Sequence, residues 1–200
     1  MKKIQSRDNL FFKELVKLSG SARQRGKTDQ TLLDGAHLLA AYFDAGKQPQ
    51  HILLNAAALH DAEITVLLER AAGVPVTQLD DRLFAELSEL KTPNGILALI
   101  DIPQPVGMVA DSRFVLLLEG IQDPGNLGSM LRSAAAAGCD AVFLSEGCAD
   151  AWSPKVLRAA MGGHFALDIH DRQDLQVIAK AFSGILLATS LQSEHSLYDC

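Results

Sequence analysis

Cysteine is scarce in this sequence, and the few cysteines present show no metal-binding spacing. There are three, Cys139, Cys148 and Cys200, an odd number without a CxxC pair. Zinc sites need closely spaced cysteine or histidine ligands, and the six histidines include no HExxH segment. We therefore expect no metal site, and reduced thiols in a cytoplasmic protein.

Long apolar runs are also missing. No segment reaches the roughly 18 apolar residues of a transmembrane helix, and the opening MKKIQSRDNLFF lacks the apolar region of a signal peptide. This predicts no membrane partner and a cytoplasmic location. A content of 48% hydrophobic and 21% charged residues is ordinary for a globular protein.

An excess of positive charge is absent overall but present locally. The net charge is −6, yet residues 1–27 carry eight Lys or Arg against two acids, a local charge of +6. Phosphate binding requires a local basic field, so this segment is a candidate RNA contact. We interpret GSARQRGKTDQ as a flexible RNA-grasping loop with Arg23, Arg25 and Lys27 as contacts. A solvated helix face beside a mobile N-terminus is the alternative.

The glycine motifs of nucleotide-binding enzymes are missing as well. Gly120, Gly125 and Gly128 do not match GxGxxG, and no P-loop lysine follows them. The run LLLEGIQDPGNLGSMLRSAAAAG, residues 116–138, instead predicts a strand, a tight loop and a helix from about residue 127. In this interpretation the Pro-Gly pair makes a turn, and Asp123 or Asn126 caps the helix. An ordinary βα unit with a solvated arginine remains open.

Elsewhere the pattern predicts alternating strands and helices on both sides of a prolyl linker. Residues 1–101 are expected to form a three-layer α/β sandwich, residues 102–110 the linker, and residues 111–200 a mostly parallel sheet with helices on both faces. The expected helices are 10–18, 36–45, 62–72, 80–90, 154–161 and 171–182; the expected strands are 31–33, 52–54, 74–77, 95–101, 113–118, 141–144, 165–169 and 184–189.

The segment Ser153-Pro154-Lys155 predicts a helix start, with serine as the N-cap and proline in the first turn. Lys155 and Arg158 are three residues apart and therefore share a helix face. They are candidate contacts for RNA phosphate, and a capped surface helix without such a role is the alternative.

Three segments resemble one protein family. DPGNLGSMLRSAAAAG is similar to the first motif of the SpoU/TrmH family of RNA ribose 2′-O-methyltransferases, in the SPOUT superfamily, and CADAWSPKVLRAAMGGHF to the family's next segment. The opening, from IQSRDNLFF to DGAHLL, resembles its N-terminal RNA-binding domain. The resemblance implies an L30e-like α/β/α domain followed by a SPOUT domain of α/β knot type.

The resemblance also implies a chemistry. In the family, the arginine corresponding to Arg132 is assigned to activating the ribose 2′-hydroxyl, and Asn126 would hold the loop and that arginine in place. S-adenosylmethionine is the implied cofactor, with Thr189 and Leu191 as contacts at a strand end. The implied substrate is ribosomal RNA, with transfer RNA as the alternative, and the implied assembly is a homodimer.

Two later family motifs, a GxExxG-like loop and an SLNxSxA-like segment, do not occur among the 200 residues. In the family they supply much of the cofactor pocket and complete the knot. We therefore expect a C-terminally truncated chain with an incomplete SPOUT domain. A non-catalytic RNA-binding module is the main alternative, and an ordinary Rossmann-type enzyme is disfavoured by the glycine spacing.

Overall fold

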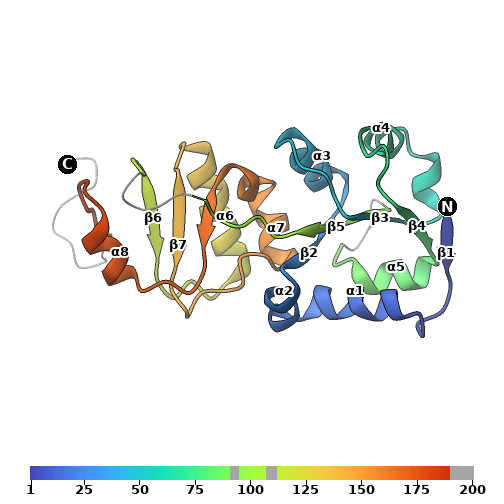
Figure 1. Ribbon diagram of the computed structural model, residues 1–200, viewed down its shortest axis with the longest axis horizontal. Helices are drawn as coiled ribbons and strands as arrows, with labels where there is room; N and C mark the ends of the chain where they lie inside the picture. Colours follow the sequence, from blue (N-terminus) through green and yellow to red (C-terminus); the bar gives the residue numbers. More distant parts are fainter. Residues whose placement is uncertain (91–94, 107–111, 190–200) are drawn as a thin grey trace.

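The strands of this protein form two separate sheets (Figure 1). The structure is a computed structural model and describes residues 1–90, 95–106 and 112–189. The first sheet has five strands in the order β1-β4-β3-β5-β2, and the second has three in the order β6-β7-β8. Helices α6 and α7 lie between the second sheet and the first in the same view.

The first sheet is mixed. Strands β1, β4 and β3 are parallel, whereas β5 runs antiparallel to both of its neighbours, β3 and β2. Because β2 stands at the end of the strand order, it is an edge strand of this sheet. The bounds are β1 Lys2–Ile4, β2 Gln30–Asp34, β3 His51–Leu54, β4 Val76–Leu79 and β5 Ile96–Asp101.

Helices cover both faces of this sheet, which confirms the three-layer arrangement. Figure 1 shows α1 (Leu10–Gly20), α2 (Ala22–Thr28) and α5 (Asp81–Leu87) on one side, and α3 (Ala36–Asp44) and α4 (Ala62–Arg70) on the other. Side chains alternate between the two layers, as the period of a strand requires. Leu53 packs with the α1 and α5 side, whereas its neighbours Ile52 and Leu54 pack with α3 and α4.

The second sheet is wholly parallel among the described residues, as predicted. Its strands are β6 (Val115–Leu118), β7 (Ala141–Leu144) and β8 (Asp168–His170). Helix α6 (Pro124–Ala136) joins β6 to β7, and α7 (Pro154–Ala160) precedes a 3₁₀ turn, Gly163–Ala166, before β8. Helix α8 (Leu175–Ala181) follows β8 and has no buried residue.

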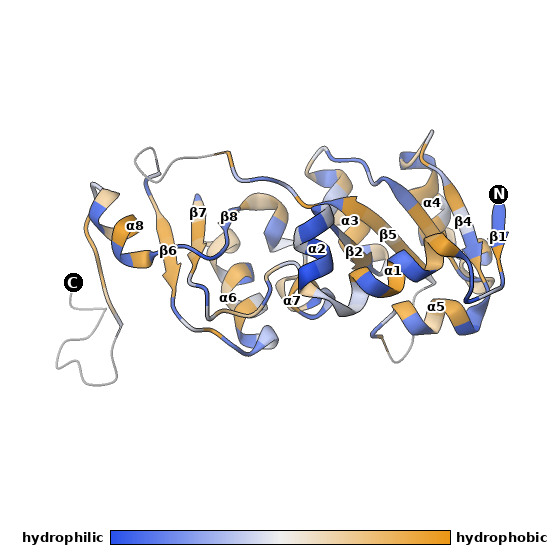
Figure 2. Ribbon diagram, turned by 60° about the horizontal axis from the view of Figure 1, so that its bottom comes forward, coloured by the Kyte–Doolittle hydropathy of each residue, from blue (hydrophilic) through white to orange (hydrophobic). Residues whose placement is uncertain are grey.

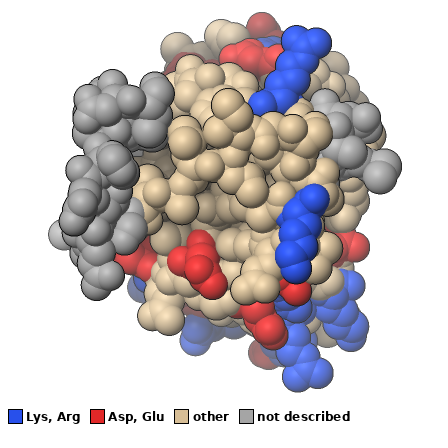
Figure 3. Space-filling view, turned by 90° about the vertical axis from the view of Figure 1, so that its left-hand side faces the viewer, with Lys and Arg blue, Asp and Glu red and all other residues tan. Residues whose placement is uncertain are grey.

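The end of the molecule formed by β6 and α8 carries few charges. Figure 3 shows a broad uncharged area there, with Lys, Arg, Asp and Glu mostly towards its margins. Several large apolar side chains on these elements are solvent-exposed, namely Phe114, Val177, Ile185, Leu186 and Leu187. Exposed apolar surface of this kind marks a contact face.

Three local predictions were wrong. Residues 22–28 form α2 instead of a flexible loop, because the Ser21 side chain caps the helix by accepting a hydrogen bond from the Gln24 amide at 3.2 Å. The sequence pattern did not predict strand β1, because this strand has three residues and two of them are lysines. Residues 184–189 form no strand: their apolar side chains lie exposed, and none of the described strands pairs with them.

A shared apolar core joins the two parts of the chain. One cluster of buried residues runs from α3 and the first sheet into α6, α7 and the second sheet. The Tyr42 ring of α3 meets Phe165 edge-on at 5.1 Å, and α7 packs along β2. Covering β2 in this way protects an edge strand. Figure 2 shows the apolar residues on the strands, whereas α2 is strongly hydrophilic.

Helices α6 and α7 are packed so closely that a glycine is required between them. A Cβ atom at Gly128 would lie 2.4 Å from the Ala159 Cβ and 2.7 Å from the Val156 carbonyl oxygen. Backbone atoms cannot give way as a flexible side chain can. The contact therefore fixes the position of α6 on α7.

We predict that Gly128→Ala destabilises the protein although alanine favours helices. The overpacking cost of about 1–3 kcal/mol should exceed the helix-propensity gain of about 1 kcal/mol. Urea unfolding measures the difference. Gly20→Ala, at the end of α1 with no atom within 4 Å of an added Cβ, is the control and should be neutral or stabilising. A Gly128→Ala variant as stable as this control would show that α6 can shift on α7.

Candidate functional site

The first element of the candidate site is the loop that leads from β6 into α6. Asp123 caps the helix, since its Oδ1 accepts a hydrogen bond from the Asn126 amide at 2.7 Å. Of the two predicted caps, Asp123 is therefore correct. Pro124 occupies the first turn, so the helix begins three residues earlier than expected and the Pro-Gly pair belongs to it.

Asn126 and Arg132 are both exposed on α6. Six residues apart, they point about 120° away from each other and lie about 9 Å apart along the helix axis. The Arg132 side chain makes no hydrogen bond or ion pair within the described ranges. Its backbone is packed against the 3₁₀ turn, where a Cβ at Gly163 would come 3.1 Å from the Arg132 Cα. The guanidinium is thus free while its attachment is rigid.

A cleft of about 490 Å³ lies where the two parts of the chain meet, at the carboxyl ends of β7 and β8. Neither Asn126 nor Arg132 lines it. Its charged lining residues, four acids and two arginines, are Asp29, Glu146, Asp150, Asp171, Arg25 and Arg172. Burial raises the pKa of Asp171. This acidic balance disfavours binding of phosphate inside the cleft.

The three cations expected to bind RNA from residues 20–30 are separated by helix geometry. Arg23 and Lys27 lie four residues apart on one exposed face of α2 and have no partner among the described residues. Arg25 points the opposite way and is buried. Its side chain is only 6% exposed and pairs with Asp150 at 2.5 Å. The guanidinium of Arg25 is thus occupied within the protein, which disfavours the predicted contact with RNA.

Helix α7 begins as predicted. The Ser153 hydroxyl accepts a hydrogen bond from the Val156 amide, and Pro154 stands in the first turn. Lys155 and Arg158 are exposed. Lys155 is unpaired within the described part of the chain, whereas Arg158 donates a long hydrogen bond of 3.4 Å to the Glu89 carbonyl oxygen. Both remain available to an anion.

Of the two predicted cofactor contacts, Thr189 and Leu191, Thr189 alone falls among the described residues. Thr189 lies in exposed chain away from the cleft, and Leu191 lies outside the described residues. Within the described ranges, no three Cys, His, Asp or Glu side chains gather as a metal site would require. None of the helices found there is both long and apolar enough to cross a membrane.

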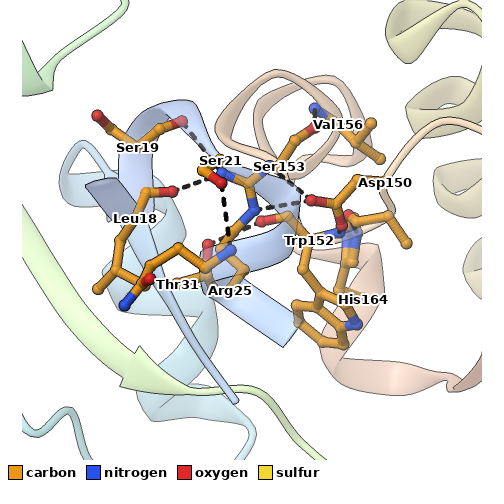
Figure 4. A network of polar contacts seen from close by, with 12 residues as sticks. Leu18, Ser19, Ser21, Arg25, Thr31, Asp150, Trp152, Ser153, Val156 and His164 are labelled. Atoms are coloured by element: carbon orange, nitrogen blue, oxygen red, sulfur yellow. Dashed lines mark hydrogen bonds and ion pairs between the residues drawn. The ribbon is translucent and has the colours of Figure 1, made fainter. Parts of the chain in front are cut away.

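Residues that pattern analysis missed hold the loop before α7, residues 150–152, which we call the junction loop. The Thr31 hydroxyl donates to the Trp152 carbonyl oxygen at 2.7 Å, and the His164 Nε2 donates to the Ala151 carbonyl oxygen at the same distance (Figure 4). The Trp152 and His164 rings are 5.0 Å apart. Thr31 and Trp152 are 121 residues apart and His164 and Ala151 are 13 apart. No sequence pattern within one helix or turn could therefore have predicted these hydrogen bonds.

Comparison with known proteins divides the chain into the same two parts as the two sheets do. The model of the SpoU rRNA Methylase family matches residues 113–199, and that of the MRM3-like substrate binding domain matches residues 9–98. An uncharacterized tRNA/rRNA methyltransferase of Synechocystis is 32% identical over 98% of this chain and 73% of its own length. The 23S rRNA (guanosine(2553)-2′-O)-methyltransferase RlmP of Bacillus subtilis is 38% identical over 84% of this chain.

Solved structures show the same fold. An RNA 2′-O ribose methyltransferase superposes with a TM-score of 0.69 and 28% identity, covering 88% of this chain and 67% of that one. An rRNA methyltransferase from Sinorhizobium meliloti gives a TM-score of 0.73 at 22% identity, over 89% and 68% of the two chains. The two-part α/β architecture is thus that of the SpoU-type methyltransferases.

The chain belongs to the SpoU/TrmH family of RNA 2′-O-methyltransferases. It spans 64% of the length of the Bacillus subtilis relative and 40% of a zebrafish mitochondrial rRNA methyltransferase to which it is 36% identical.

Burial of His164 predicts an acid-sensitive junction. Desolvation lowers the pKa of His164 from 6.5 to about 4. Between these values the unfolded chain takes up a proton that the folded protein does not, so the free energy of unfolding falls as the pH falls from 6.5 to 4. The loss amounts to about 3 kcal/mol, and it levels off below pH 4.

Urea unfolding as a function of pH measures this effect in His164→Gln, which retains a neutral donor. The wild-type protein should lose about 3 kcal/mol more than the variant across this range. His60→Gln, at an exposed position, is the control and should follow the wild type. Parallel profiles for wild type and His164→Gln would contradict the assignment.

Proposed function

We propose that this protein transfers a methyl group from S-adenosylmethionine to a ribose 2′-hydroxyl of ribosomal RNA. The observation that carries the proposal is the free guanidinium of Arg132, held on a rigidly packed helix of a SpoU-type domain. The guanidinium of Arg25, by contrast, is committed to an ion pair. Arg132 therefore has the availability that a substrate contact needs.

The proposed domain boundaries follow from the same reasoning. In this proposal residues 1–101 are an L30e-like RNA-binding domain, residues 102–110 a linker, and residues 111–200 a SPOUT domain of the knotted type. The match of residues 9–98 to a substrate-binding domain supports the first assignment. We refer below to the substrate domain and the methyltransferase domain in this sense.

RNA is proposed to lie along the side of the substrate domain formed by α1, α2 and α5. The exposed cations Arg23 and Lys27 project from α2, and no acid in the described ranges neutralises them. Arg158 contacts the Glu89 carbonyl, directly after α5, and so extends the basic surface onto the methyltransferase domain. Lys155 lies one turn earlier on α7. Basic side chains on both domains would thus contact successive phosphates of the RNA.

The proposed chemistry relies on orientation. A ribose hydroxyl is a weak nucleophile and must be positioned or deprotonated. A guanidinium with a pKa above about 12 cannot readily accept a proton, so Arg132 would orient ribose and phosphate, with Asn126 supporting the same loop. S-adenosylmethionine supplies an electrophilic methyl group when it is bound. The exposed chain around Thr189 forms no cradle for that cofactor among the described residues.

The substrate is proposed to be ribosomal RNA, with transfer RNA as the alternative. The Bacillus subtilis relative is named for guanosine 2553 of 23S rRNA, and an RNA hairpin around that nucleotide is a suitable probe. A homodimer is also proposed, because the β6 and α8 end exposes apolar side chains with few charges. The free thiols of Cys139 and Cys148 support a cytoplasmic location.

A non-catalytic RNA-binding module is the second candidate. The observation that favours it is the exposed position of Thr189, away from any described cofactor cradle. The two candidates differ in one measurement. Transfer of a labelled methyl group to the hairpin supports the enzyme, whereas binding without transfer supports the module.

We predict that Arg132→Ala lowers methyl transfer to the hairpin by at least a hundredfold while the Kd for RNA changes less than threefold. Oriented contacts are worth about this much in rate. Arg132→Lys keeps the charge but loses the planar fork and should also be slow. The control is Arg70→Ala. Arg70 lies on α4, on the face of the first sheet opposite the proposed RNA surface of α1, α2 and α5, so this variant should be fully active. Turnover by Arg132→Ala at the wild-type rate would remove Arg132 from the reaction.

We also predict that Arg23→Gln combined with Lys27→Gln weakens RNA binding and its salt dependence. Each lost phosphate contact should reduce the slope of log K against log[salt] by about 0.7–0.9. Fluorescence anisotropy of the hairpin at several salt concentrations measures the slope. The double variant Lys47→Gln with Arg70→Gln removes equal charge from the other face and should leave the slope unchanged. Equal slopes in all three proteins would exclude α2 from the RNA surface.

A further inference from the structure

Every nitrogen of the Arg25 guanidinium has a partner, and two of the three reach the methyltransferase domain. Nε and Nη2 meet Asp150 Oδ2 at 2.7 and 2.5 Å, and Nη1 donates to the Leu18 and Ser19 carbonyl oxygens (Figure 4). Those carbonyls belong to the last turn of α1, where helical acceptors lack an intrahelical donor. The side chain therefore joins the end of α1 to the junction loop.

The junction loop is held at each of its three residues. Asp150 is bound by Arg25, and its Oδ1 also accepts a hydrogen bond from the Trp152 amide at 3.0 Å. The Ala151 carbonyl accepts from His164, and the Trp152 carbonyl accepts from Thr31 of β2. Two of these contacts, those of Arg25 and Thr31, come from the substrate domain.

The loop transmits its position to the candidate catalytic helix. It runs directly into Ser153, the cap of α7, and α7 packs against α6 with no room for a side chain at Gly128. Helix α6 carries Arg132. An uninterrupted series of close contacts thus runs from α1 and α2, through the junction loop and α7, to Arg132.

We propose that Arg25 and Asp150 are positioning residues, which fix the angle between the substrate domain and the methyltransferase domain so that bound RNA meets Arg132. This inference rests on the proposed function. It assigns different roles to two arginines of one short helix: Arg23 contacts RNA from the exposed face, and Arg25 orients the domains from the buried face. Neither Arg25 nor Asp150 touches the reacting atoms.

The chain provides its own reporter for this contact. Trp152 is the single tryptophan of the sequence, and it lies buried in the junction loop. Its emission should move to longer wavelength, and its quenching by acrylamide should increase, when the loop is released. Circular dichroism establishes that each variant is folded.

The experiment compares Arg25→Lys, Arg25→Gln, Asp150→Asn and Thr31→Val with the wild type. Three quantities are measured: Trp152 emission, the Kd for the 23S rRNA hairpin, and kcat for methyl transfer at saturating RNA. We expect released Trp152 and a kcat at least tenfold lower in Arg25→Gln and Asp150→Asn, with a Kd within twofold of wild type. Arg25→Lys keeps one ion pair and should be intermediate in both emission and kcat.

Arg23→Gln is the matched control, two residues away on the same helix. It should give the opposite result, with unchanged Trp152 emission and a raised Kd. If Arg25→Gln fails to fold, Thr31→Val releases the same loop at Trp152, through a second contact between the domains, without leaving an unpaired charge. It should shift the emission and lower kcat in the same direction.

Several results would overturn the proposal. Unchanged Trp152 emission in all four variants would show that these contacts do not hold the loop. Released Trp152 with a wild-type kcat would show that the orientation does not matter, and a Kd that rises in step with the loss of kcat would make Arg25 an RNA contact. A wild-type protein that transfers no methyl group refutes the proposed function and the catalytic half of this inference, whereas the emission data still decide whether the pair holds the loop.

Discussion

A largely buried ion pair between Arg25 and Asp150 connects the two halves of this protein. Taking the Arg25 side chain out of water is costly, and the cost is offset because each of its guanidinium nitrogens has a partner within the protein. Removing one partner of such a pair typically costs about 3–5 kcal/mol. The same pair secures the end of α1 and the start of α7, and α6 takes its place from α7. The candidate catalytic arginine thus depends on a contact made far from it.

In the proposed arrangement, one set of residues binds RNA and another set orients the two domains. The exposed cations of α2 and α7 lie where phosphates can reach them, whereas the cleft between the domains is acidic and unsuited to RNA. The overall charge of −6 is compatible with an RNA partner because residues 1–27 have a local charge of +6. Acidic residues near the junction would repel RNA from the cleft and favour the basic path.

The features that could be predicted from the sequence were those with local causes. The cap and first turn of α7 were correct because Ser153 and Pro154 determine them within four residues. The start of α6 was misplaced because a Pro-Gly pair suits both a turn and a first helical turn. The burial of Arg25 could not be predicted, since its partner lies 125 residues away. Residues 184–189 have a strand-like composition, but a strand also requires a neighbour to pair with, which composition does not reveal.

The apolar core that crosses the junction has an evolutionary consequence. Many multidomain enzymes exchange their recognition modules, because the surfaces between modules are small and polar. Here the buried Tyr42 ring, the edge of β2 and the side chain of Trp152 belong to one continuous interior. A recombination event within residues 102–110 would leave both halves with a mismatched surface unless the complementary side chains travelled together. The two halves of the chain are therefore expected to have diverged as one inherited unit.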